Sequence, residues 1–124
     1  MMTISDKKIL IVEDDQPLAN ALKFKFSKNG LKVKTVFDGR QAIEILKTET
    51  YDLILCDLIM PIIDGFKVLE FLKENKITTP VIVLSNLGQV EDEKRAKELG
   101  AIDFLVKSNI SIKDIIGKTI KIIK

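Results

Sequence analysis

Histidine is absent from this sequence of 124 residues, and cysteine occurs once. Without histidine the chain has no histidine metal ligand, no histidine-containing catalytic triad and no phosphohistidine of its own. The single cysteine excludes an internal disulfide. Its position in an apolar segment indicates that Cys56 is a small buried hydrophobe and not a reactive thiol.

Long apolar runs are also missing. None approaches the roughly 20 residues of a membrane helix, and the first residues lack a signal-peptide core, so we expect a cytoplasmic protein with no membrane partner. Neither sign of charge is in excess: 20 basic and 18 acidic residues give +2, which does not indicate direct nucleic-acid binding. The length and the composition, 46% hydrophobic and 31% charged, predict one globular domain over residues 1–124.

The apolar pattern divides the chain into five strands that alternate with five helices. The expected strands cover residues 8–13, 31–36, 53–56, 81–84 and 102–106. Strict alternation with short connections predicts an α/β fold with a parallel sheet and helices on both faces. Residues 31–36 alternate between apolar and polar, which indicates an edge strand, and acids after the first and third strands indicate that these two are neighbours. We therefore predict the strand order 2-1-3-4-5.

Charged side chains follow three of these strands: Glu13 and Asp14 the first, Asp57 the third and Lys107 the fifth. The carboxyl ends of parallel strands share one edge of the sheet, so we expect these charges to meet in a crevice there. Three carboxylates raise one another's pKa unless a cation lies among them, and Mg²⁺ prefers such oxygen ligands. A phosphoryl group on Asp57 would then contact the ion, Lys107 and the hydroxyl of Ser85.

Five segments carry a resemblance to a known family: KILIVEDD, FDGRQAIEIL, YDLILCDLIMPIIDGFKVLEFLK, the serine after VIVL, and EKRAKELGAIDFLVK. In this order and at these intervals, they make the chain resemble the receiver domain of two-component response regulators over essentially its whole length. The resemblance implies a flavodoxin-like fold. It also implies a signalling protein that catalyses its own phosphorylation and dephosphorylation and is not an enzyme of metabolism.

The resemblance implies a phosphoacceptor and a metal site. Asp57 would receive the phosphoryl group. Mg²⁺ would be held by that carboxylate, by the acidic pair Glu13 and Asp14, and by the backbone carbonyl of Ile59. Asp15 follows Asp14 directly in the sequence, but its position before Pro17 favours a helix N-cap over a metal ligand.

The resemblance also implies that Ser85 and Lys107 bind the phosphoryl oxygens, and that Phe104 is an aromatic switch that turns inward when the Ser85 hydroxyl moves. Two positions depart from the family pattern. Asn86 replaces a small residue after the hydroxyl, and Ser108 replaces a proline after the lysine. A cis bond without proline costs roughly 2.5–4 kcal/mol, so we expect a trans bond and a differently shaped loop after Lys107.

The implied phosphodonor is a histidine kinase or a phosphotransfer protein. Phosphorylation would shift the population of a protein-interaction face made by the fourth helix, the fifth strand and the fifth helix, and so control binding of a downstream protein. The mixed charges of the fourth helix and the basic fifth helix could pair across a two-fold homodimer. With no linker in the sequence, we expect either a stand-alone receiver or one excised from a longer chain.

Three alternatives remain open from the sequence. A degenerate receiver that binds proteins without being phosphorylated is favoured by Asn86 and Ser108. A metal-dependent phosphatase needs a second acid two residues after the nucleophile, where Ile59 stands. A flavin-binding relative needs a phosphate-binding loop rich in serine, threonine or glycine, where this chain has acids.

Overall fold

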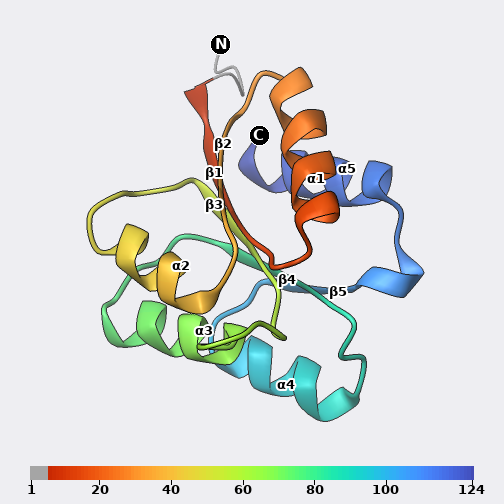
Figure 1. Cartoon of the computed structure of the whole chain (residues 1–124). Helices are drawn as coiled ribbons and strands as arrows, with labels where there is room; N and C mark the ends of the chain where they lie inside the picture. The colour runs from red at the N-terminus through yellow and green to blue at the C-terminus, as the bar shows by residue number, and fades with distance from the viewer. Residues whose placement is uncertain (1–5) are drawn as a thin grey trace.

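A parallel sheet of five strands lies in the middle of the protein, in the order β2-β1-β3-β4-β5 (Figure 1). The computed structural model describes residues 6–124. The strands are β1 (Lys8–Val12), β2 (Lys32–Val36), β3 (Leu53–Cys56), β4 (Val81–Ser85) and β5 (Asp103–Val106). The predicted α/β class, strand number, parallel direction and strand order are confirmed. The alternating segment forms β2 at one edge, as expected.

Helices cover both faces of the sheet (Figure 1). One layer consists of α1 (Gln16–Lys28) and α5 (Ile112–Ile123), and the other of α2 (Gly39–Leu46), α3 (Gly65–Glu74) and α4 (Val90–Glu98). A short 3-10 turn, η2 (Lys107–Asn109), follows β5. No helix within residues 6–124 is long and apolar enough to cross a membrane.

Each central strand contributes side chains to two separate cores, because successive residues of a strand point to opposite faces. In β1, Leu10 and Val12 pack in the core under α2, α3 and α4. Ile9 and Ile11 pack in the core under α1 and α5. All residues of β3 and β4 are buried, as their continuous apolar sequences predict for central strands of a parallel sheet.

Short polar side chains fix where the helices begin. Asp15 Oδ1 accepts a hydrogen bond from the backbone N–H of Leu18 at 3.2 Å, which confirms Asp15 as the N-cap of α1. Ser111 Oγ accepts one from Asp114 N–H at 3.1 Å at the start of α5. Such caps satisfy N–H groups that have no partner inside the helix.

Gly65 begins α3 directly against the backbone that follows β3. A Cβ atom at this position would overlap the carbonyl oxygen of Asp57 and lie 2.7 Å from Leu58 Cα. We therefore expect Gly65→Ala to lower the free energy of unfolding by about 3 kcal/mol or more, since backbone cannot move aside cheaply. Gly117→Ala is the matched control: nothing lies within 4 Å of the added Cβ in α5. It should raise stability by about 0.5–1 kcal/mol in urea unfolding. Equal stability of the two variants would contradict this packing.

Candidate functional site

The three acids after β1 and β3 meet at the carboxyl edge of the sheet. β1 and β3 are paired neighbours with Val12 opposite Cys56, so the residues that follow them emerge side by side. One carboxylate oxygen from each of Glu13, Asp14 and Asp57 lies within 4.8 Å of the others. Glu13 and Asp57 are buried, while Asp14 is exposed. The expected crevice of acids is present in the fold.

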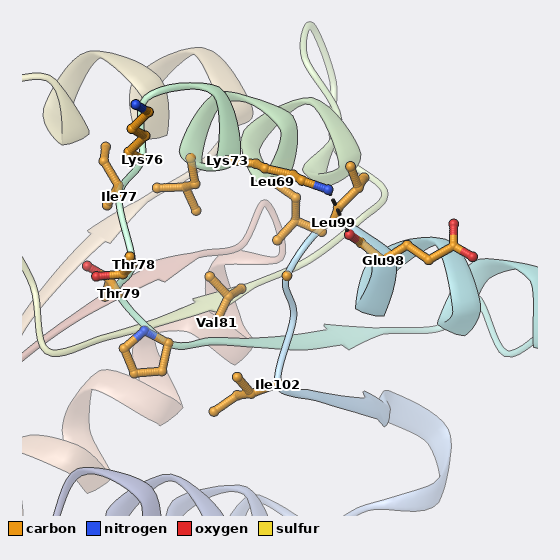
Figure 2. Close-up of a pocket in the computed structure, with 13 residues that line it drawn as sticks. Leu69, Lys73, Lys76, Ile77, Thr78, Thr79, Val81, Glu98, Leu99 and Ile102 are labelled. Carbon is orange, nitrogen blue, oxygen red and sulfur yellow. Dashed lines mark hydrogen bonds between the residues drawn. The ribbon is translucent and has the colours of Figure 1, made fainter.

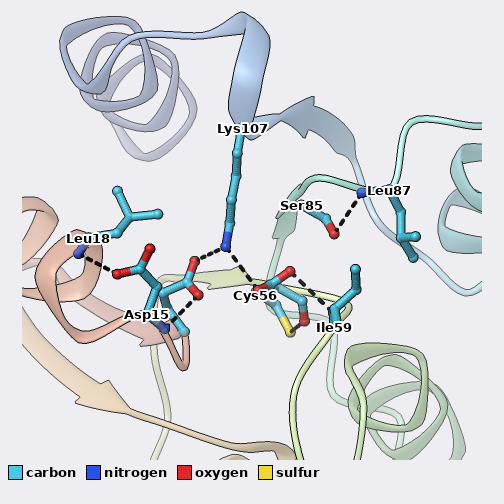
Figure 3. A network of polar contacts seen from close by, with 9 residues as sticks. Asp15, Leu18, Cys56, Ile59, Ser85, Leu87 and Lys107 are labelled. Carbon is cyan, nitrogen blue, oxygen red and sulfur yellow. Dashed lines mark hydrogen bonds and ion pairs between the residues drawn. The ribbon is translucent and has the colours of Figure 1, made fainter.

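Lys107, which follows β5 at the same edge of the sheet, contacts two of these acids. It begins the turn after β5, and its side chain extends toward the ends of β1 and β3 (Figure 3). Its Nζ lies 2.6 Å from Glu13 Oε1 and 2.9 Å from Asp57 Oδ2, and the side chain is 16% exposed. Burial alone would lower the Lys107 pKa, but hydrogen bonding and attraction to Glu13 and Asp57 raise it overall. The ammonium group is therefore firmly protonated at neutral pH.

The pKa of the Glu13 carboxyl group is raised. Its side chain is only 2% exposed. Loss of solvation, together with repulsion from Asp57, raises its pKa from 4.5 to about 7. The ammonium of Lys107 and the backbone N–H of Asp15, which donates to Oε2 at 3.1 Å, act in the opposite direction. The other oxygen, Oε1, lies 2.6 Å from the Lys107 ammonium.

The raised pKa of Glu13 predicts a pH dependence of stability in the presence of a chelator. Between about pH 4.5 and pH 7 the folded chain binds the Glu13 proton more tightly than the unfolded chain does. Unfolding free energy should therefore fall as pH rises through this interval, by up to about 3 kcal/mol, and level off above it. Urea unfolding of wild type and Glu13→Gln measures this contribution by difference. A difference that is flat from pH 4.5 to pH 8 would contradict it.

Ser85 and Ile59 lie at the same edge of the sheet, whereas Phe104 lies within β5. Ser85 ends β4 with no exposed surface, and its Oγ accepts a hydrogen bond from Leu87 N–H at 3.3 Å (Figure 3). The backbone N–H of Ile59 donates to Asp57 Oδ1 at 3.2 Å. Phe104 is 9% exposed and lies in the core under α2, α3 and α4.

Three features of the site were not predicted from the sequence. They are the bond from Asp15 N–H to Glu13, the partner of the Ser85 hydroxyl, and the 3-10 turn that carries Lys107. No sequence pattern identifies the two backbone donors. The absence of proline after Lys107 did indicate an altered loop, and residues 6–124 contain no cis peptide bond, so the expected trans bond before Ser108 is confirmed.

A separate hollow of about 370 Å³ lies between the ends of α3 and α4, at the opposite edge of the sheet (Figure 2). Its lining includes Val81 at the start of β4, and Lys73 Nζ donates to the Glu98 carbonyl oxygen at 3.1 Å. Glu98 is the only acid in the lining. The group of acids suited to a metal ion is therefore at the other edge, around Asp57.

Comparison with known proteins agrees with this geometry. Residues 9–119 match the response regulator receiver domain family. The transcriptional regulatory protein CiaR of Streptococcus pneumoniae is 43% identical over 100 residues, which cover 81% of this chain and 44% of that protein. The cell cycle response regulator CtrA of Brucella ovis is 33% identical over 81% of this chain and 43% of its own length. The chain thus spans less than half the length of these relatives.

Solved structures give the same result. The receiver domain of the Francisella response regulator 1452 superposes with a TM-score of 0.88 at 35% identity, over 95% of this chain and 97% of that one. The non-phosphorylated HemR receiver domain of Leptospira biflexa superposes with a TM-score of 0.89 at 25% identity, over 96% and 95%. With the family match over most of its length, the chain belongs to the response regulator receiver domains of two-component signalling.

Proposed function

We propose that this protein is a phosphoacceptor receiver in which Asp57, with Mg²⁺ bound, takes a phosphoryl group from a histidine kinase or a phosphotransfer protein. The observation that carries this proposal is the meeting of Glu13, Asp14, Asp57 and Lys107 at one point from three strand ends. A capping or structural role for Asp57 alone would not require the other charges.

The residues present fit a magnesium ion. Three carboxylates lie within 4.8 Å of one another, and one ammonium group, that of Lys107, contacts two of them, so a hard cation would offset the negative charge that remains. We assign Glu13, Asp14, Asp57 and the carbonyl oxygen of Ile59 as its ligands. When bound, the ion would neutralise negative charge on the phosphoryl oxygens.

Asp57 is held ready for the transfer. Lys107 holds Oδ2, and the Ile59 N–H holds Oδ1, which fixes the plane of the carboxylate. One carboxylate oxygen attacks phosphorus and forms the O–P bond, while the N–P bond of the donor phosphohistidine breaks and its nitrogen keeps the electron pair. Lys107 then binds a phosphoryl oxygen, so positioning and charge supply most of the catalysis.

The switch begins at Ser85. Its hydroxyl now accepts from Leu87 N–H, and we propose that it turns to donate to a phosphoryl oxygen, which draws the β4–α4 loop toward Asp57 and packs Phe104 more deeply. α4 buries only Ala96, so its position rests on few apolar contacts. A small charge change can therefore shift the population of the face formed by α4, β5 and α5.

We propose that residues 1–124 act as one receiver domain in the cytoplasm, that the downstream partner is a protein, and that the chain makes no direct contact with nucleic acid. A homodimer through α4 and α5 is also proposed. Light scattering that gives monomer mass both with and without phosphorylation would rule the homodimer out.

Incubation with acetyl phosphate, followed by intact mass measurement, tests the proposal. Wild type should gain one phosphoryl group when Mg²⁺ is present and little or none in a chelator. Absence of the adduct would instead favour a degenerate receiver that binds proteins without phosphorylation. The exposed Asn86, which follows Ser85 at the site, is the feature that favours this second candidate.

A further inference from the structure

The two helical layers differ sharply in charge. The α1–α5 face, defined as α1, α5 and the following Lys124, has seven lysines and one aspartate, a net charge of +6. Since the whole chain has a net charge of +2, the residues outside this face have a net charge of −4. All seven lysines are exposed: Lys23, Lys25, Lys28, Lys113, Lys118, Lys121 and Lys124. The nearly balanced total charge therefore conceals a basic face.

The only contact of these seven ammonium groups with another described side chain that the structure shows is that of Lys28 Nζ, 5.3 Å from the centre of the exposed Phe24 ring. Within residues 6–124, none of the seven forms an ion pair. On the other layer, basic side chains of α3 and α4 do form them: Lys67 and Arg95 with Glu70, and Lys97 with Glu93. The positive field of the α1–α5 face is thus available to an external acidic group.

A hollow of about 440 Å³ lies between the two helices of this face. It is lined by Ile112 and Ile116 of α5, with Lys25 of α1, the C-cap residue Asn29 and Lys113 of α5 around them. Its exposed surface is almost entirely apolar, and the two charged groups of its lining are both ammonium groups. The volume is in the range that takes an inserted side chain of a ligand.

We propose that the α1–α5 face docks an acidic segment of a partner protein, which inserts an apolar side chain onto Ile112 and Ile116 and places carboxylates beside Lys25 and Lys113. The hollow favours a protein segment, because a bilayer surface or a phosphate backbone needs the lysines but has no use for a concave apolar floor. The absence of arginine from this face also argues against a phosphate backbone as the ligand. Phe24 is its only largely exposed aromatic residue, which argues against a bilayer. This docking surface shares α5 with the face formed by α4, β5 and α5 but is completed by α1, and it does not depend on phosphorylation of Asp57.

Fluorescence anisotropy of the full chain with a labelled amphipathic peptide, leucine on one face and glutamate on the other, tests this docking. Wild type should bind it, and a glutamate peptide without leucine should bind at least tenfold more weakly. The double variant Lys25→Glu/Lys113→Glu should lose at least tenfold in affinity. Ile112→Ser, which changes no charge, should lose severalfold, and urea unfolding checks that each variant is folded.

Lys118→Glu/Lys121→Glu is the matched control, because it changes the charge of the same face by the same amount away from the hollow. Less than threefold loss is expected. Equal losses in the two double variants would reduce the effect to unspecific attraction and overturn the proposal. Tighter binding to anionic phosphatidylglycerol vesicles or to duplex DNA than to the peptide would also overturn it. The phosphoryl adduct of Lys25→Glu/Lys113→Glu should equal that of wild type, so loss of docking and failure of phosphorylation are distinguishable.

Discussion

Asp57→Asn is expected to form no phosphoryl adduct with acetyl phosphate and Mg²⁺ under conditions in which wild type forms one. An amide keeps the shape of the side chain but lacks the carboxylate oxygen that attacks phosphorus. The variant should remain folded, because it removes one negative charge that lies beside the buried Glu13. Intact mass spectrometry measures the adduct, and urea unfolding measures the stability.

Asp15→Asn provides the matched control for this prediction. Asp15 lies at the same edge of the sheet but caps α1, and asparagine caps helices about as well. Its adduct should therefore equal that of wild type. An undiminished adduct in Asp57→Asn would move the phosphoacceptor to another carboxylate, and loss of the adduct in both variants would indicate a general effect of charge.

Lys107→Met should be the most damaging single substitution of a charged residue for stability. In a chelator, two buried carboxylates would lose the one cation that both contact, and we expect a loss of about 3 kcal/mol of unfolding free energy. The loss should be larger at pH 8 than at pH 6, because Glu13 can take up a proton at the lower pH and relieve the repulsion. Urea unfolding at both values measures this difference.

Two comparisons isolate the cause of that loss. Lys113→Met, at an exposed position without an ion pair among the described residues, should change stability by less than about 0.5 kcal/mol. Mg²⁺ should restore part of the stability of Lys107→Met if it binds the carboxylates, since binding to the folded state alone stabilises it. Unchanged stability of Lys107→Met in a chelator would mean that the ion pairs contribute little.

The fold was largely predictable from the sequence because its signals are local and agree with one another. Continuous apolar runs predicted β3 and β4 as buried strands, and the alternating residues of β2 predicted an edge. Boundaries of the elements moved by one residue: the first strand was expected over residues 8–13, and β1 ends at Val12. The last residue of a strand or helix depends on the competition between backbone and solvent hydrogen bonds, which a sequence pattern describes poorly.

The site was predictable in its membership but not in its contacts. The topology of a parallel sheet is enough to bring Glu13, Asp57 and Lys107 to one edge. It does not fix which oxygen Lys107 selects, and in the structure this side chain pairs with Glu13 as well as with Asp57. The Ser85 hydroxyl bonds to Leu87 N–H and not to the acids. These choices depend on side-chain torsions and backbone positions, for which the sequence has no local signal.

Locating the phosphoryl group is the most direct test of the central claim that Asp57 is the phosphoacceptor. Wild type treated with acetyl phosphate and Mg²⁺ is reduced with borohydride, which converts an acyl phosphate on aspartate to homoserine, and is then digested for tandem mass spectrometry. The proposed mechanism predicts homoserine at position 57 and at no other aspartate. Homoserine at Asp14 or Asp15, or an adduct that resists borohydride, would contradict it.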